Sequence, residues 1–169
     1  MENRSQTAVR TYLELRDPGE LHPARIDDLP VRVERVEECP PSFWRFLYNE
    51  VGRRYHWVDR LGWTDQDILN YLHDPSVSLW LLTVAGAPAG YFELRRDPED
   101  AFEVAYFGLL KEFTGRGFGA YLLTEAVERA WALGATRVWL HTSTLDHPAA
   151  LPNYLKRGFQ VFRTEEYAV

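Results

Sequence analysis

Apolar and polar residues alternate along several short stretches of the chain, a pattern typical of strands with one buried face. In the first two-thirds of the sequence this pattern predicts strands over residues 7–16, 30–36, 77–84, 89–94 and 102–110. Only Ala-Gly-Ala-Pro at residues 85–88 separates the third strand from the fourth, which predicts a tight turn and a hairpin. This part of the chain is therefore expected to form neighbouring strands in a meander.

Two helices are expected between the second and third strands. Pro40 and Pro41 suit the start of the first helix, where backbone N–H groups have no partner within the helix. The apolar residues that follow with helical spacing are Phe43, Trp44, Phe46, Leu47 and Val51. Thr64 and Asp67 resemble a capping box, which predicts a second helix that continues through Leu72.

The last third of the sequence alternates between helices and strands. An amphipathic helix is predicted from about residue 118 to residue 133, and Gly134 suits its C-terminal end. Its inner face consists of Phe118, Leu122, Leu123, Ala126, Val127 and Ala130. Strands over residues 136–142 and 159–163 flank a short helix at residues 148–157. Hairpins followed by a strand–helix–strand crossover predict a mixed sheet of the α+β or α/β class.

Composition and charge narrow the classes of function. The 169 residues suit a single domain, and 46% of them are apolar or aromatic, which is ordinary for a protein with a core. The formal net charge of −6 argues against a nucleic-acid partner and favours cationic small molecules or basic peptides. Cys39 is the single cysteine of the sequence, so neither an internal disulfide nor a cysteine-based metal site is expected.

No segment suggests insertion into a membrane. The sequence contains no run of about eighteen apolar residues, the length that a spanning helix needs. Its first residues, MENRSQT, lack the apolar core of a signal peptide. We therefore expect a soluble, cytoplasmic protein without a membrane partner.

A glycine-rich segment lies between the strand at residues 102–110 and the long helix. It reads Gly-Arg-Gly-Phe-Gly-Ala at residues 115–120. Glycines allow a sharp turn close to a ligand, and the free N–H groups at a helix start attract phosphate groups. A plain turn without a ligand is the alternative for such a motif taken alone.

Two common phosphate-binding motifs do not fit this segment. Gly115, Gly117 and Ala120 satisfy the G-x-G-x-x-G/A pattern of a dinucleotide site. That site expects an acidic residue about 20 positions later, and residues 137–142 contain none. Only 27 residues follow this strand, too few to complete a doubly wound sheet. A P-loop is excluded because the segment has no Gly-Lys-Ser/Thr.

A wider stretch of the sequence resembles the acetyl-CoA motif of the GNAT acetyltransferase superfamily. That motif is a strand, a Q/R-x-x-G-x-G/A loop and a helix, and residues 103–123 are similar to it. Farther on, Tyr154, Gly158 and Phe159 resemble the family's Y-x-x-x-G-F ending. One predicted strand separates the two motifs, as in the family, and together they cover about residues 102–162.

The resemblance implies a GNAT fold, which is a twisted and mostly antiparallel sheet with flanking helices and a splayed strand pair at the acetyl-CoA site. It implies one domain over residues 1–169, with residues 1–100 mainly on the acceptor side and residues 101–169 mainly on the acetyl-CoA side. The implied activity is acetyl transfer from acetyl-CoA to a primary amine by direct attack in a ternary complex, without a metal. A non-catalytic acyl-CoA-binding or sensing module of the same fold is the alternative.

On the acetyl-CoA side, the resemblance implies that residues 107–109 offer backbone groups to the pantetheine amides and that the glycine loop binds the pyrophosphate. The family's Gln/Arg at the loop start is Thr114 here, so weaker binding is expected, with Arg116 as a substitute charge. His147 stands where many members carry Asn, and it either hydrogen-bonds the cofactor or caps a helix. The implied cofactor-binding residues are Phe107, Gly108, Leu109, Thr114, Gly115, Arg116, Gly117, Phe118, Gly119, Ala120 and His147.

Two proton transfers define the candidate catalytic residues. The departing thiolate needs a proton, and Tyr154 lies where the resemblance places the family's acid; the reference pKa of tyrosine, about 10, suits this donation. The attacking amine must lose a proton to a base. Glu103 is the first candidate, because the resemblance to the histone-acetylating branch places a glutamate base there. Glu93 and His141 are the other candidates.

The acceptor is expected to bind against an aromatic segment. Rings together with acidic groups can hold an ammonium ion through cation–π contacts and charge. The substrate-binding residues expected on this basis are Tyr55, Trp57 and Glu93, although most rings in residues 43–71 are expected to be buried. The acceptor class stays open between a small-molecule amine and a peptide or protein amine, and exposed edge strands leave a homodimer open.

Overall fold

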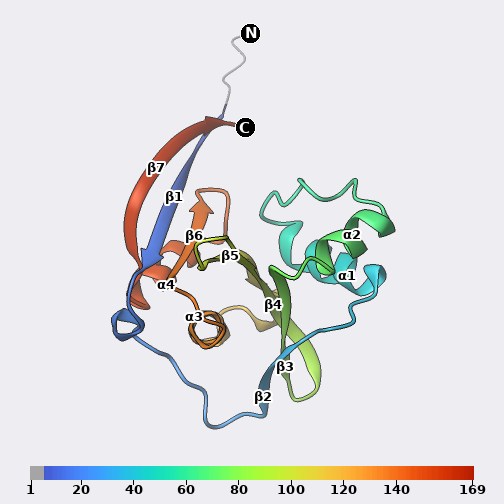
Figure 1. Ribbon diagram of the computed structural model, residues 1–169, viewed down its shortest axis with the longest axis horizontal. Helices are drawn as coiled ribbons and strands as arrows, with labels where there is room; N and C mark the ends of the chain where they lie inside the picture. Colours follow the sequence, from blue (N-terminus) through green and yellow to red (C-terminus); the bar gives the residue numbers. More distant parts are fainter. Residues whose placement is uncertain (1–5) are drawn as a thin grey trace.

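The computed structural model describes residues 6–169 and contains one seven-stranded sheet in the order β2-β3-β4-β5-β6-β1-β7 (Figure 1). The strands are β1 (Thr7–Leu15), β2 (Val31–Arg35), β3 (Val77–Val84), β4 (Ala87–Arg96), β5 (Ala101–Leu109), β6 (Arg137–Ser143) and β7 (Gln160–Ala168). Neighbouring strands are antiparallel except for the parallel pair β5 and β6. The mixed and mostly antiparallel sheet expected from the sequence is confirmed.

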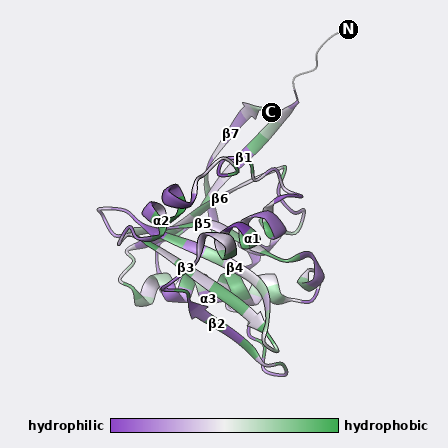
Figure 2. Cartoon of the chain, turned by 90° about the vertical axis from the view of Figure 1, so that its right-hand side faces the viewer, coloured by the Kyte–Doolittle hydropathy of each residue, from purple (hydrophilic) through white to green (hydrophobic). Residues whose placement is uncertain are grey.

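Helices cover both faces of this sheet. They are α1 (Pro41–Gly52), α2 (Asp65–Leu72), α3 (Phe118–Ala132) and α4 (Ala150–Lys156), with 3-10 turns η1 (Pro18–Glu20) and η2 (Lys111–Phe113). α3 packs into one apolar core, and α1 and α2 pack into a second core on the other side of the sheet (Figure 1). In Figure 2 the central strands carry much of the apolar colour, whereas the edge strand β2 is largely polar.

The local patterns in the sequence explain most helix positions. The Thr64 side chain accepts from the Asp67 N–H while the Asp67 side chain accepts from the Thr64 N–H, so the expected capping box is confirmed. All residues expected on the inner face of the long helix are buried in α3. Phe46 is an exception on α1, because its side chain is exposed and the apolar face of that helix is carried by Trp44, Leu47 and Val51.

The outer half of the sheet has an arrangement that the sequence pattern does not reveal. β1 lies between β6 and β7 and pairs with both (Figure 1). β7 is longer than the expected strand at residues 159–163, because it pairs with β1 from Gln160 to Ala168. Its last residues carry no apolar alternation, since β7 is an edge strand that is largely exposed along its length. Pairing with β1 therefore defines this strand.

The parallel strands β5 and β6 pair at only three positions, which end at Glu103 and Trp139. Beyond them, β5 follows β4 up to Leu109, whereas β6 follows β1 up to Ser143. The two strands therefore diverge and leave a wedge between their C-terminal halves. The splayed strand pair implied by the resemblance is present at this position.

Glycine at position 108 lets α1 approach the wedge. A Cβ atom on Gly108 would lie 2.4 Å from Cγ1 of Val51, a distance at which side-chain atoms clash. The close approach of α1 to β5 places the segment after α1, residues 53–64, beside the wedge.

Candidate active site

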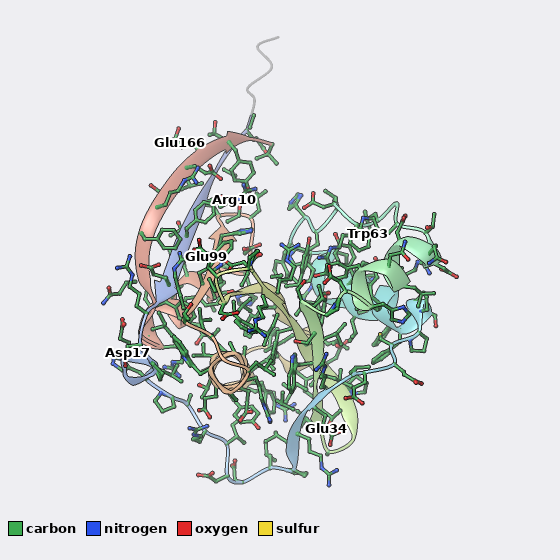
Figure 3. All side chains as sticks on the ribbon, viewed as in Figure 1. Arg10, Asp17, Glu34, Trp63, Glu99 and Glu166 are labelled. Carbon is green, nitrogen blue, oxygen red and sulfur yellow. The ribbon has the colours of Figure 1, made fainter. Side chains whose placement is uncertain are left out.

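A cavity of about 720 Å³ opens where β5 and β6 diverge. Its walls come from β5, β6, the glycine loop, α4 and the segment at residues 55–59. Arg10 and Tyr167 add to the wall from β1 and β7. Figure 3 shows Arg10 on β1, on the side of the strand toward the part of the molecule that carries Trp63. One cavity thus joins parts of the chain that are far apart in sequence.

The glycine loop presents backbone rather than side chains to this cavity. Gly115 and Gly117 both line it and have left-handed backbones, with φ of 74° and 84°. A Cβ atom on either residue would meet no atom within 4 Å, so the space in front of the loop is open. Gly117 is also the N-cap of α3, and no side chain caps that helix. Its first N–H groups are free to bind an anion such as a phosphate group.

Most of the residues expected at the cofactor line the cavity, and two do not. Those that line it are Phe107, Gly108, Leu109, Thr114, Gly115, Gly117, Gly119, Ala120 and His147. The Phe118 side chain is fully buried in the core. The Arg116 guanidinium lies over the ring of Phe118, 5.0 Å from its centroid, and does not line the cavity. The structure therefore places the expected substitute charge outside the cavity.

The Thr114 hydroxyl is already hydrogen-bonded within the loop. The Thr114 hydroxyl donates to the carbonyl of Lys111 over 2.8 Å, at the end of the 3-10 turn η2. Nδ1 of His147 accepts from the N–H of Ala149 over 2.9 Å, just before α4, and no side chain caps the start of that helix. Its ring also packs edge-on against Tyr55, with centroids 5.8 Å apart, so it links the two sides of the cavity.

Tyr154 lines the cavity from α4 opposite β5. Its ring packs edge-on against Phe107 and in a tilted arrangement against Phe159, each with centroids 6.2 Å apart. Burial, together with the nearby Asp146 carboxylate, raises the pKa of Tyr154 well above its ordinary value. The hydroxyl is therefore protonated at neutral pH and has a proton to donate.

Glu103 lies at the point where β5 and β6 part, and its side chain is buried at the cavity wall. One carboxylate oxygen accepts from Nη2 of Arg95 over 2.9 Å, and the other lies 3.9 Å from Nε2 of His141. Burial lowers the pKa of His141, although Glu103 acts in the opposite direction. His141 is therefore neutral at pH 7. Two of the candidate bases thus lie side by side in the cavity.

The structure does not bring Glu93, the remaining candidate base and substrate ligand, to the cavity. Its side chain is fully buried beneath α1 and α2 and forms an ion pair with Arg60. By contrast, the predicted acceptor residues Tyr55 and Trp57 line the cavity together with Asp59. Trp57 packs edge-on against Tyr106 of β5, with centroids 5.0 Å apart.

Several cavity residues were not among the site residues expected from the sequence. Asn153 precedes Tyr154 on α4, so the motif around the tyrosine could have indicated it. Arg10 and Tyr167 reach the cavity only because β1 lies between β6 and β7. Arg10 pairs with Glu165 over 2.9 Å and lies over the Tyr167 ring. No local pattern predicts that strand order.

Comparison with known proteins identifies the family. Residues 37–159 match the family model described as the acetyltransferase (GNAT) family. The chain belongs to the GNAT family. This confirms the resemblance found in the two sequence motifs, and membership supports an acyltransferase function.

The chain is also similar to individual proteins. The chain is 32% identical over 170 residues to a mycothiol acetyltransferase of Corynebacterium aurimucosum. The match covers 87% of this chain and 53% of that protein. The chain thus spans about half the length of this relative. A GCN5-related N-acetyltransferase from Kribbella flavida has a similar structure, with a TM-score of 0.69, 18% identity and coverage of 95% of this chain and 57% of its own.

A second similar structure matches this chain over most of its own length. It is an aminoglycoside acetyltransferase from an uncultured soil metagenomic sample, with a TM-score of 0.60 and 15% identity. The match covers 75% of this chain and 86% of that one. At this identity the likeness concerns the fold.

Two features are absent from the part of the chain that the structure describes. Within residues 6–169, no helix combines the length and the apolar character needed to cross a membrane. Over the same residues, no three His, Cys, Asp or Glu side chains come together as a group that could hold a metal ion.

Proposed function

We propose that the protein is an N-acetyltransferase that transfers an acetyl group from acetyl-CoA to a primary amine by direct attack in a ternary complex. The observation that carries this proposal is the cavity between β5 and β6, which has open backbone N–H groups at the glycine loop and both Tyr154 and Glu103 in its wall. Family membership supports acyl transfer in general. We further propose that residues 101–169 form mainly the acetyl-CoA side and residues 1–100 mainly the acceptor side of one domain.

The chain offers two sets of backbone groups to acetyl-CoA. The N–H groups of the glycine loop and of the first turn of α3 would bind the pyrophosphate. Beyond Glu103, β5 has no pairing with β6, so the backbone groups of residues 107–109 on that side are free to bond the pantetheine amides. The acetyl group would then lie in the wedge.

The side chains in the wedge would carry out two proton transfers. An amine with a pKa of about 10.4 must lose a proton before it attacks, which costs about 4–5 kcal/mol at pH 7. Glu103 would accept this proton directly or through water, with His141 beside it as the alternative base. As the N–C bond forms and the C–S bond breaks, Tyr154 would donate its proton to the leaving thiolate.

A non-catalytic acyl-CoA-binding module remains the second candidate, because Thr114 replaces the family's Gln/Arg at the loop start. Calorimetric titration with acetyl-CoA, with NADPH as the control, distinguishes the cases when it is followed by an amine panel monitored through release of free thiol. We expect saturable acetyl-CoA binding and turnover. Binding without turnover on any amine would favour the binding module, and no binding would contradict both.

The acceptor is proposed to be a small-molecule amine or a peptide or protein amine. The relatives include proteins named as mycothiol and aminoglycoside acetyltransferases, so amines of these two kinds belong in the panel. Tyr55, Trp57 and Asp59 would form the acceptor-side wall.

Glu103→Gln is expected to lower the rate at neutral pH and to move the pH–rate profile upward. Without the carboxylate, only the fraction of amine that is already neutral can react, and that fraction grows as the pH approaches the pKa of the amine. The pH dependence of kcat/KM measures this effect. His141→Gln is the companion variant. An unmoved profile in Glu103→Gln together with a moved profile in His141→Gln would assign the base to His141.

A further inference from the structure

Arg60 carries the most deeply buried positive charge in the part of the chain that the structure describes, and its surroundings are aromatic. Its side chain is only 5% exposed. The guanidinium lies over four rings, with distances to their centroids of 3.9 Å for Tyr106, 4.2 Å for Tyr71, 4.7 Å for Trp63 and 5.6 Å for Trp44. We call these four rings the aromatic cage. A cage of this kind binds cations through the negative faces of its rings.

Glu93 of β4 closes the cage from the sheet side. Nη1 of Arg60 donates to both of its carboxylate oxygens, over 2.9 and 3.2 Å. Glu93 also accepts from the Tyr71 hydroxyl over 2.5 Å and from Nε1 of Trp44 over 3.3 Å. Burial disfavours the charged guanidinium, but Glu93 together with the nearby Tyr71 and Tyr106 outweighs this effect and raises the pKa of Arg60 above its ordinary value. Arg60 is therefore permanently charged, and its charge is matched.

Arg60 also ends the stretch of chain that forms the acceptor-side wall. Residues 55–59 line the cavity, and Arg60 follows directly. At the start of this stretch, the N–H groups of Tyr55 and Trp57 donate to the carbonyl of Gly52 at the end of α1. At its far end the Arg60 N–H donates to the Tyr48 hydroxyl, and its side chain reaches Glu93. The stretch is thus held at both ends, and the second attachment is Arg60.

The cage connects directly to the cavity through shared side chains. Tyr106 belongs to the cage and lines the cavity as well. Trp57, which also lines the cavity, packs against the same Tyr106 ring. A change in the position of Arg60 would therefore displace Tyr106 and Trp57 in the cavity wall.

We propose that Arg60 is a positioning residue, whose guanidinium fills the aromatic cage on Glu93 and thereby fixes residues 55–59 as the wall that binds the acceptor. The chain's own cation occupies the cage, so the acceptor ammonium binds elsewhere, in the wedge near Glu103 and Asp59. This inference rests on the proposed function for the identity of the ligand, while the anchoring of residues 55–59 is independent of it.

The test compares Arg60→Ala and Arg60→Lys with a matched control, Arg129→Ala. Arg129 also lies over a tryptophan, Trp80, and pairs with a glutamate, Glu125, but it is on α3, whose inner face packs into the other core. For Arg60→Ala we expect the acceptor KM to rise about tenfold or more, with a smaller change in kcat and unchanged affinity for acetyl-CoA. Arg60→Lys keeps the charge without the planar fork and should be intermediate. Arg129→Ala should leave all three values unchanged.

Two further measurements separate positioning from a general loss of structure. Millimolar guanidinium should restore the acceptor KM of Arg60→Ala by refilling the cage, whereas sodium chloride at equal ionic strength should not. Hydrogen exchange should be faster in residues 53–64 of Arg60→Ala and unchanged in α3. If Arg60→Ala does not fold, the acceptor KM and the hydrogen exchange of residues 53–64 are compared between Arg60→Lys and the wild type.

The outcomes distinguish this inference from the proposed function. Unchanged exchange in residues 53–64 would overturn the anchoring role, whatever the activity. Faster exchange with an unchanged acceptor KM would overturn the link to acceptor binding. A wild-type protein that acetylates no amine would overturn the proposed function, and hydrogen exchange alone would then decide whether Arg60 anchors the wall.

Discussion

Gly117→Glu is expected to abolish saturable binding of acetyl-CoA. Gly117 has a φ of 84° and lines the cavity, and nothing lies within 4 Å of the place where its Cβ would be. The glutamate side chain would therefore be accommodated without a clash. It would place bulk and negative charge in the space proposed for the pyrophosphate. Its carboxylate would also neutralise the positive end of the α3 dipole, which would otherwise attract the phosphate groups. Calorimetric titration measures the loss.

A matched control separates this effect from backbone strain. Gly86 in the β3–β4 turn has a φ of 86° and an equally open Cβ position, but it does not line the cavity. A residue other than glycine in this conformation costs about 1–2 kcal/mol, so Gly86→Glu and Gly117→Glu should lose similar stability in thermal unfolding. Only Gly117→Glu should lose the ligand. Retained affinity in Gly117→Glu would contradict the assignment of the loop.

The parts of the site that could be predicted are those defined by neighbours in sequence. The glycine loop needs only a strand before it, a helix after it and glycines between them, and these features are local. Tyr154 belongs to a second motif of the same kind, and the structure places it across the wedge from β5. The capping box of Thr64 and the inner face of α3 follow for the same reason.

The parts that could not be predicted depend on pairing between distant segments. Glu93 is a carboxylate on the strand beside β5, and nothing in the sequence says that Arg60 will neutralise it. The aromatic segment indicated an acceptor site at Tyr55 and Trp57, but nothing in the sequence indicated that Trp63 and Tyr71 would surround Arg60. Similarly, Arg10 reaches the cavity through the insertion of β1 beside β6, which hydrophobic periodicity does not encode.

Tyr154→Phe is expected to slow turnover roughly 10²–10⁴-fold, the usual contribution of a general acid. Burial and the charge of Asp146 both raise the pKa of Tyr154, so its hydroxyl holds a proton until the thiolate leaves. Phenylalanine would keep the packing against Phe107 and Phe159, so stability and acetyl-CoA affinity should change little. Stopped-flow or steady-state measurement of thiol release would give kcat, and titration would give the affinity.

Tyr121→Phe is the control, because it removes the same hydroxyl from a buried tyrosine on α3 that does not line the cavity. It should leave kcat unchanged. The pH profile supplies a second check: because the pKa of Tyr154 is raised, the wild type should show no loss of rate from its ionisation up to about pH 10. An unchanged kcat in Tyr154→Phe would mean that water protonates the thiolate, and the tyrosine would then contribute only its ring to the wall opposite Phe107.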